Sequence, residues 1–461
     1  MKKALICYFF GFSFIFSQDF SLQEAWRYVL DHNDGIKAEE LGVQRQSKLS
    51  LSAKLSFLPN IDITAFYAHL ANPIQLSTEG TKKDIINSLP NLGGGESILP
   101  IINSALGHIP NQVDLIKQDI IVGSINIIYP LYTGGQRYYL TKIAKIEEKD
   151  SQEVLRLKKL ATFEELVKVY YSIWLQRELR RTLESIHQSA LAHYHNALKL
   201  QKAGQIAKLE VLGAQVALQK TENKLKESQN LLEISHMALD IVLQSKNANP
   251  TSGIKVPKGD FLESEDYYVQ KTIDSYPVLR SLDSKIQVAK EMKKIQIAKF
   301  LPTITAMGSY FIDNQFLLNH QSLPSWYVGV FARLPLITPG GRIPQIQAAT
   351  ITQMQLDKTK AQATKDMELL ARRTYKEVLF AKQEYMGMDV SVKLAQENLK
   401  LQEKAFSQGL VTSLQVNDAI NALSSVLIEQ KTLAYKYIVL LSKLMVLSGD
   451  IDRFYEIQNL Q

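Results

Sequence analysis

The stretch Pro130-Leu131-Tyr132-Thr133-Gly134-Gly135 returns later in this chain of 461 residues as Pro335-Leu336-Ile337-Thr338-Pro339-Gly340-Gly341. Both copies stand where a strand-like run ends and a helix-like run begins. The motif Phe-Leu-Pro likewise occurs at 57–59 and at 300–302. Six further residues recur at one constant offset: Gly204, Leu209, Val211, Ala214, Ala217 and Leu218 return as Gly409, Leu414, Val416, Ala419, Ala422 and Leu423. The chain is therefore one architectural unit built twice, with a period of about 205 residues.

Long helices dominate both halves. Between Gly135 and Ala203 the chain contains no proline or glycine, and strong helix formers prevail. The spacing predicts helices at about 135–203, 207–245, 343–408 and 413–448. At a rise of 1.5 Å per residue, a helix of about 70 residues is about 100 Å long. From Val416 to Leu444 the seam positions alternate steps of four and three and are apolar with one exception, Gln430, which is typical of a coiled-coil seam.

Each half also carries two shorter stretches in which apolar and polar residues interleave, as they do in strands. These stretches lie at about 60–71, 119–131, 303–317 and 325–337. Their lengths suit tilted membrane strands of about 9–11 residues, and aromatic residues such as Tyr310 and Trp326 cluster toward their ends, as in interfacial girdles. A soluble hairpin with exposed aromatic residues is the alternative interpretation. The connection from His69 to Lys117 is predicted to be a long irregular loop, and that from Asn319 to Pro324 a short one.

Four strands cannot close a barrel, and this limits how the chain can assemble. An open sheet edge in hydrocarbon leaves backbone groups without hydrogen bonds at several kcal/mol each, so open sheets do not span membranes. If these strands enter a bilayer, several chains must share one barrel. Two chains would supply about eight strands, whose side chains fill the interior, whereas three chains would supply about twelve and leave room for a pore.

The first residues predict export. Met1-Lys2-Lys3 precedes an apolar run of about 13 residues, and residues 1–17 are predicted to be a signal peptide. The single cysteine, Cys7, lies inside it, so disulfides and cysteine-based metal sites are not expected in the mature chain. No later stretch of 18 apolar residues predicts a spanning helix. The net charge of +7 is spread along the helices and does not indicate nucleic-acid binding.

Taken together, the duplicated strand-to-helix junctions, the paired Phe-Leu-Pro motifs and the Gly-x-x-x-x-Leu-(Glu/Gln)-Val segments at 204–211 and 409–416 resemble the TolC family of outer-membrane efflux and secretion channels. The resemblance extends from about 20 to 449. It implies a mainly α fold with a small β part, in which a homotrimer forms a 12-stranded β-barrel joined to a long α-helical barrel. The predicted organisation is a signal peptide at 1–17, a first repeat at 18–246, a linker at 247–263, a second repeat at 264–449 and a tail at 450–461.

The resemblance also implies a function. The chain is expected to be a passive, porin-like exit duct in the lipid of the outer membrane, with its helical barrel in the periplasm. Its expected partners are a periplasmic adaptor protein and, through it, an energised inner-membrane transporter of RND, ABC or MFS type. Drug efflux, metal efflux and protein secretion all fit such a duct, because a water-filled interior recognises its cargo weakly.

The residues that the resemblance singles out fall into three groups. The helix-hairpin tips are expected to dock the adaptor: Gly204, Gln205, Ile206, Lys208, Gly409, Leu410, Val411 and Thr412. The periplasmic entrance is expected at Glu210, Gln415 and Asp418, where the family often has acidic residues. Gln415 departs from that pattern, and Asp418 either forms a ring of three carboxylates or is a solvated helix residue. The strand–helix junctions comprise Pro59, Gly134, Gly135, Pro302, Gly340 and Gly341.

The sequence predicts no enzyme, and neither a cofactor nor a metal site is expected. His193 and His195 are two residues apart on a helix and therefore point to different faces. Gly93-Gly94-Gly95 does not follow a strand and precede a helix as a phosphate loop would. A secreted, soluble coiled-coil scaffold is the main alternative, although it leaves the aromatic hairpins unexplained. A helical-barrel enzyme would need a polar constellation that the sequence does not contain.

Overall fold

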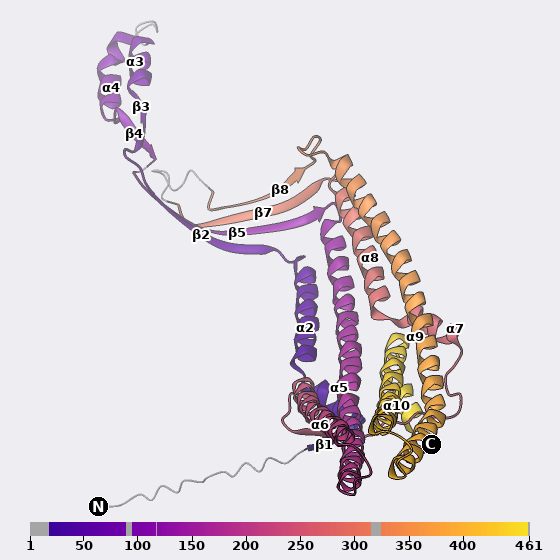
Figure 1. The fold of residues 1–461 in the computed structure, drawn as a ribbon. Helices are drawn as coiled ribbons and strands as arrows, with labels where there is room; N and C mark the ends of the chain where they lie inside the picture. The colour runs from indigo at the N-terminus through magenta and orange to yellow at the C-terminus, as the bar shows by residue number, and fades with distance from the viewer. Residues whose placement is uncertain (1–17, 89–94, 117, 315–323, 460–461) are drawn as a thin grey trace, which may run out of the picture. The chain divides into compact units, whose positions relative to one another are not determined.

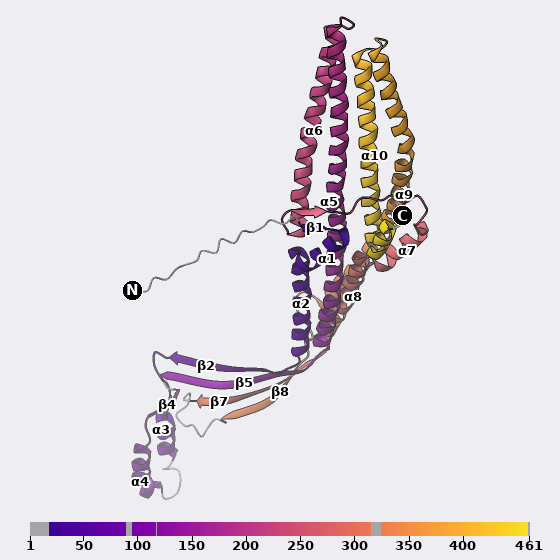
Figure 2. The ribbon, with the colours of Figure 1, turned by 90° about the horizontal axis from the view of Figure 1, so that it is seen from below.

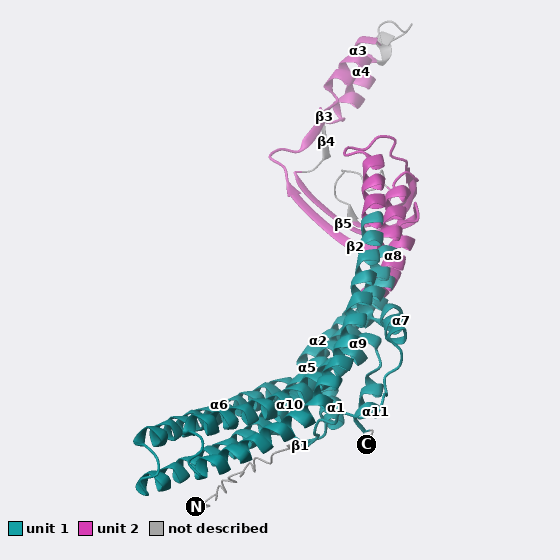
Figure 3. Ribbon diagram, turned by 45° about the vertical axis from the view of Figure 1, so that its right-hand side comes forward, with its two compact units in different colours: residues 1–47, 146–287, 354–461 teal, residues 48–145, 288–353 magenta. Residues whose placement is uncertain are grey.

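The computed structural model describes residues 18–88, 95–116, 118–314 and 324–459. The predicted signal peptide lies outside these residues, as do Gly93 and Gly94 and nearly all of the predicted short loop at 319–324. The chain forms two compact units (Figure 3). The division assigns residues 1–47, 146–287 and 354–461 to unit 1, and residues 48–145 and 288–353 to unit 2.

Two long helical hairpins make up most of unit 1 and lie side by side (Figure 2). The first consists of α5 (Gln136–Lys202) and α6 (Lys208–Leu243), and the second of α9 (Arg342–Ser407) and α10 (Ser413–Ser448). Near the tips their apolar stripes meet in one buried cluster that includes Ala197, Val211, Phe406 and Ile420. Within the described residues, no helix combines the length and the apolar character needed to cross a membrane.

A second buried cluster, around Tyr170, Tyr437 and Phe454, attaches smaller elements to these hairpins. The smaller elements are β1 (Gln18–Phe20), α1 (Leu22–His32), β6 (Ala248–Pro250), α7 (Glu265–Ser275) and α11 (Ile451–Asn459). The buried Tyr170 hydroxyl donates to the carbonyl of Phe20 at 2.7 Å, which ties β1 to α5. The predicted linker thus contributes a strand, parallel to β1, and the predicted tail contributes a helix whose Phe454 is fully buried.

Unit 2 is built on one antiparallel sheet (Figure 1). Its strands are β2 (Asn60–His69), β5 (Asp119–Thr133), β7 (Thr303–Asn314) and β8 (Trp326–Arg333), in the order β2-β5-β7-β8. The chain reaches β2 from α2 (Asp34–Leu55) and β7 from α8 (Pro277–Ala298). Each predicted pair of strands forms, and the central pairing of β5 with β7 joins the two halves of the sequence.

The register places most of the exposed apolar side chains of this sheet on one face and its polar side chains on the other, which also carries Phe66 and Phe331. One face is apolar and exposed in the single chain, with Ile61, Ile63, Ile127, Tyr310, Trp326, Val328 and Val330. The other face carries a polar network centred on Asn126. Its side-chain amide donates to Asp62 at 2.9 Å and to Thr64 at 3.0 Å, and its carbonyl accepts from the buried Ser309 at 2.7 Å.

The connection between β2 and β5 differs from the irregular loop that the sequence predicts. It contains β3 (Ile74–Ser77), α3 (Glu79–Ser88), α4 (Gly95–Gly107) and β4 (Gln112–Ile116), and β3 pairs with β4. Proline and glycine suggested a loop, yet Pro100 lies inside α4. The apolar residues Ile101, Ile102, Ala105 and Leu106 recur at helical spacing, and this local pattern outweighs the proline.

Candidate functional site

The two hairpin tips have the same backbone geometry. Gly204 and Gly409 both have a φ of +71°, the left-handed conformation that a glycine supplies after the last helical turn. In the second tip the Leu410 amide donates to the carbonyl of Ala405 at 3.0 Å, and the first tip has the equivalent bond. A Cβ added to either glycine would meet no atom within 4 Å. The backbone, and not packing, is therefore what requires glycine at both tips.

The residues next to the two glycines divide between the core and the surface. Ile206 and Val411 are half-buried and pack against the cluster that joins the hairpins. Gln205, Lys208 and Thr412 are exposed, and the apolar side chain of Leu410 is 73% exposed. Each tip thus combines an anchor toward the core with a side chain available to a partner.

A groove of about 630 Å³ lies between the N-terminal parts of α6 and α10. Its walls carry exposed apolar side chains, namely Leu209, Leu212, Val216 and Leu414. Lys220 adds one positive charge to the lining, and Glu210 and Asp418 add two negative charges. Exposed apolar walls with a few charges are typical of a protein-binding surface.

Three polar residues connect the two tips across this groove. The Glu210 carboxylate accepts a hydrogen bond from the backbone amide of Ser413 at 2.6 Å, at the N-terminal end of α10. The Ser413 hydroxyl lies 2.7 Å from Nε2 of His193, and both residues are buried. Burial lowers the pKa of His193 below its ordinary value, while the nearby Glu210 carboxylate partly opposes this shift. The neutral imidazole is therefore favoured in the folded tip.

The structure distinguishes the three residues predicted for the entrance. Glu210 is held at the first turn of α10, as described above. Gln415 belongs to a capping box, because its side-chain oxygen accepts from the backbone amide of Thr412 at 2.8 Å. Asp418 is exposed. The Thr-x-x-Gln spacing of the capping box is visible in the sequence, but the contact between Glu210 and α10 joins residues 203 positions apart and has no sequence signal.

Gly134 and Gly135 directly follow β5, whereas Gly340 and Gly341 directly precede α9 and lie several residues after the end of β8. Pro59 and Pro302 immediately precede β2 and β7. Gly134, Gly135, Gly340 and Gly341 all have positive φ. At Gly134 the packing is also too close for a side chain, since a Cβ would lie 2.5 Å from the carbonyl oxygen of Ala298.

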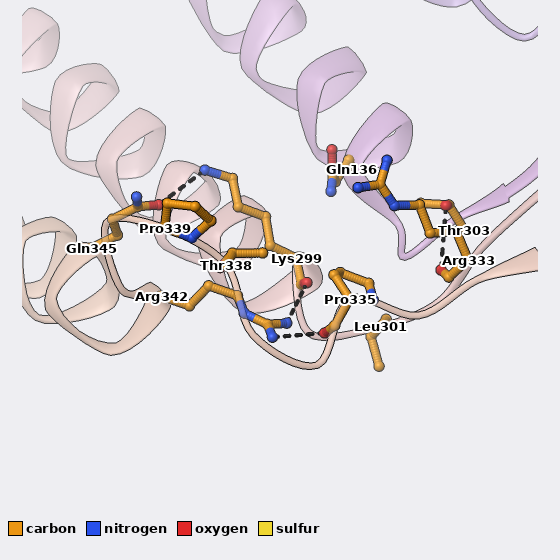
Figure 4. A pocket seen from close by; sticks show the side chains of 10 residues that line it. All are labelled: Gln136, Lys299, Leu301, Thr303, Arg333, Pro335, Thr338, Pro339, Arg342 and Gln345. Carbon is orange, nitrogen blue, oxygen red and sulfur yellow. Dashed lines mark hydrogen bonds between the residues drawn. The ribbon is translucent and has the colours of Figure 1, made fainter.

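Each junction also contains an arginine that the sequence analysis missed. The Arg137 guanidinium lies over the Phe57 ring at 4.9 Å and donates to the carbonyl of Pro130 at 2.6 Å. In the second junction, Arg342 lies over the Phe300 ring at 4.4 Å. It also donates to the carbonyl of Pro335 at 2.6 Å (Figure 4). Arg137 and Arg342 recur at the same period of about 205 residues, which is the signal that could have found them.

His193 and His195 lie in different environments. His193 is buried whereas His195 is exposed, so the two rings do not share a site. Across the described ranges, no group of three or more His, Cys, Asp or Glu side chains is arranged to hold a metal ion.

Comparison with known proteins agrees with this architecture. The family model described as outer membrane efflux protein matches residues 27–243 and 268–450. The Campylobacter jejuni CmeC outer membrane channel is 15% identical, with a TM-score of 0.71 over 95% of this chain and 89% of that chain. The outer membrane protein VceC from Vibrio cholerae is 14% identical, with a TM-score of 0.72 over 93% of this chain and 96% of that chain. The open state of the Neisseria gonorrhoeae MtrE outer membrane channel is 14% identical, with a TM-score of 0.71 over 94% and 90% of the two chains. No curated protein sequence matches this chain significantly.

Proposed function

Because this chain belongs to the outer membrane efflux protein family, we propose that it is a passive exit duct, the outer-membrane part of a tripartite efflux or type I secretion system. Three copies form the duct. A periplasmic adaptor couples it to an energised inner-membrane transporter of RND, ABC or MFS type. Energy is supplied at the inner membrane, and the duct itself performs no chemistry.

The observation that carries this proposal is the two-faced sheet. Apolar side chains such as Ile63, which is 74% exposed in the single chain, need a nonpolar environment that one chain does not provide. The opposite face bears the hydrogen-bonded network around Asn126, which suits water. A membrane barrel has this pattern, with apolar residues toward lipid and polar residues toward the interior.

The edges of the sheet support assembly of several chains. In the part of the chain that the structure describes, β2 and β8 each pair on one side only. Unpaired backbone groups are too costly in hydrocarbon, so these edges must meet strands of other copies. Three copies give about twelve strands and an interior wide enough for transport, whereas about eight strands would fill their own interior.

The tips support a role in docking and gating. The exposed Leu410 and the apolar groove between α6 and α10 offer an adaptor a surface with defined shape. Glu210 accepts from the backbone amide of Ser413 and Gln415 from that of Thr412, whereas the Asp418 carboxylate of the proposed entrance is exposed. Under threefold symmetry Asp418 would form a ring of three carboxylates. Such a ring would attract cations to the periplasmic mouth of the duct.

A matched pair of cysteine variants tests the proposal. Thr64 lies on the polar face and its neighbour Ile63 on the apolar face of the same strand. In trimers reconstituted into planar bilayers, a membrane-impermeant thiol reagent should label Thr64→Cys and reduce its conductance. Ile63→Cys should stay unlabelled, because lipid covers it. A soluble monomer in which both cysteines react, and which gives no conductance, would refute the duct and favour a coiled-coil scaffold.

A further inference from the structure

A cavity of about 330 Å³ lies within unit 2 at the second strand–helix junction (Figure 4). Its lining comes from the first residue of α5, the segment after α8, the start of β7, the end of β8, the loop that follows it and the first turn of α9: Gln136, Lys299, Leu301, Thr303, Arg333, Pro335, Thr338, Pro339, Arg342 and Gln345. Three of these ten residues are cationic, and none of the ten, all of which the structure describes, carries a carboxylate. The cavity therefore has an excess of positive charge with no partner in its own walls.

The three cations have different roles. Arg342 holds the junction together, because it donates to the carbonyls of Lys299 at 3.0 Å, Pro335 at 2.6 Å and Leu336 at 2.6 Å. Among the described residues, the Lys299 ammonium donates one hydrogen bond, to the side-chain oxygen of Gln345 at 3.1 Å. The Arg333 guanidinium is exposed and makes no hydrogen bond or ion pair with the described residues. Lys299 and Arg333 thus keep donors available for a ligand.

The first junction shows that these two cations are not needed to build the turn. There, Arg137 makes the same contacts with an aromatic ring and a proline carbonyl as Arg342 does. At the position of Lys299 the first repeat has Ser56, and at the position of Arg333 it has Ile128. The fold therefore needs only the shared arginine, and the additional charges require another explanation.

The strand register decides which face of the sheet Arg333 occupies. Arg333 pairs with Thr303, and the same alternating positions of β8 and β7 lead to Ser309 of the polar network. The apolar side chains of Val328 and Val330 occupy the other face. In the proposed duct, Arg333 faces the water-filled interior.

From this geometry we propose that the cavity binds phosphate-type anions in the interior of the duct, through Lys299 and Arg333. The proposal rests on the proposed function, which makes the polar face the interior. Charge-assisted hydrogen bonds from ammonium and guanidinium groups are strong donors to phosphate oxygens, and the guanidinium can hold two oxygens at once. In a trimer the cavity occurs three times and forms a basic belt at the base of the barrel.

Binding is tested with pyrophosphate and the purified full-length trimer in mild detergent, by equilibrium dialysis. The double variant Lys299→Ser, Arg333→Gln should bind pyrophosphate about tenfold more weakly than the parent, the loss expected for removing charged hydrogen bonds. Higher salt should weaken binding to the parent, because salt screens the charges. The control is Lys290→Ser, which removes an exposed charge from α8 outside the cavity and should leave binding unchanged. Equal loss in the control, or no loss in the double variant, would overturn the proposal.

Two further measurements distinguish a free phosphate anion from a lipid headgroup. They also distinguish failure of the anion site from failure of the proposed duct. In planar bilayers, pyrophosphate should block the parent channel at about tenfold lower concentration than the double variant. If the double variant instead loses bound phospholipid, measured by native mass spectrometry, while pyrophosphate binding is unchanged, the cations face lipid and the proposal is wrong. A protein that binds pyrophosphate at Lys299 and Arg333 but conducts no ions would refute the proposed duct and leave this anion site standing.

Discussion

Replacing Gly409 with valine tests whether the tip geometry itself serves docking. The φ of +71° is unfavourable for a residue with a Cβ by about 1–2 kcal/mol, and a β-branched side chain should lie toward the upper end of this range. A Cβ meets no atom within 4 Å, so no packing term adds to this cost. The hydrogen bond from the Leu410 amide to Ala405 depends on this turn, and its local opening should increase by a factor of about 5–30. The buried cluster between the hairpins is untouched, so the trimer should still assemble.

The assay compares three variants for abundance, export, amide exchange at Leu410 and crosslinking to the adaptor from position 411. Gly409→Val should keep normal abundance but lose export and crosslinking, and Gly204→Val should act similarly. Gly409→Asn should be closer to the parent, because asparagine tolerates left-handed backbone. Gly387→Val is the matched control, since Gly387 lies within α9 and its Cβ would also meet nothing within 4 Å. Normal export and crosslinking in both tip variants would mean that the tips are plain turns and that docking occurs elsewhere.

Three further predictions follow from the polar contacts. The pKa of His193 is lower in the folded chain than in the unfolded chain, where it is about 6.5. At pH values between the two pKa values the unfolded chain therefore binds more protons than the folded chain. The tip should be fully stabilised above about pH 6.5 and should lose stability as the pH falls toward the pKa of the folded chain. Amide exchange in the first turn of α10 should show this pH dependence, and His193→Gln, which cannot titrate there, should abolish it. Replacing Asn126 with leucine leaves the buried Ser309 hydroxyl without its acceptor, which should cost about 1–3 kcal/mol. The temperature at which trimers dissociate on a gel should therefore fall. The control Ile125→Leu, on the apolar face, should change this temperature little. Arg342→Lys should destabilise the trimer more than Arg137→Lys in the same assay, because Arg342 donates to three carbonyls and Arg137 to one. Lysine replaces neither the planar donors of arginine nor its contact with the ring. Equal effects of the two substitutions would contradict this account of the junctions.

Local patterns in the sequence predicted much of the fold. Alternation identified the strands that pair as β2 with β5 and β7 with β8, and the expected family and outer-membrane location are confirmed. The glycines of the tips have the positive φ that their position between two helices implies. The roles of the tips in docking and of Asp418 in gating stay predictions. The prediction of an irregular loop between β2 and β5 was wrong, because it relied on proline and glycine content and not on the helical spacing of the apolar residues.

Long-range contacts could not be predicted in this way. The pairing of β5 with β7, the contact of Glu210 with the amide of Ser413, and the hydrogen bond from Ser309 to Asn126 each join residues that are far apart in the chain. No periodicity links such partners, since each forms only when separate elements have packed. The same holds for Lys299, in the segment after α8, and Arg333, at the end of β8, which line one cavity.

The sequence by itself determined the duplication, the type of each long element and the turn chemistry at its ends, because helix spacing, strand alternation and glycine conformations are properties of neighbouring residues. Only the tertiary structure decided which carboxylate stays exposed at the tips, which face of the sheet is polar, and where unpaired cations meet. Those features depend on register and on packing between distant segments, where a shift of one residue exchanges the two faces of a strand.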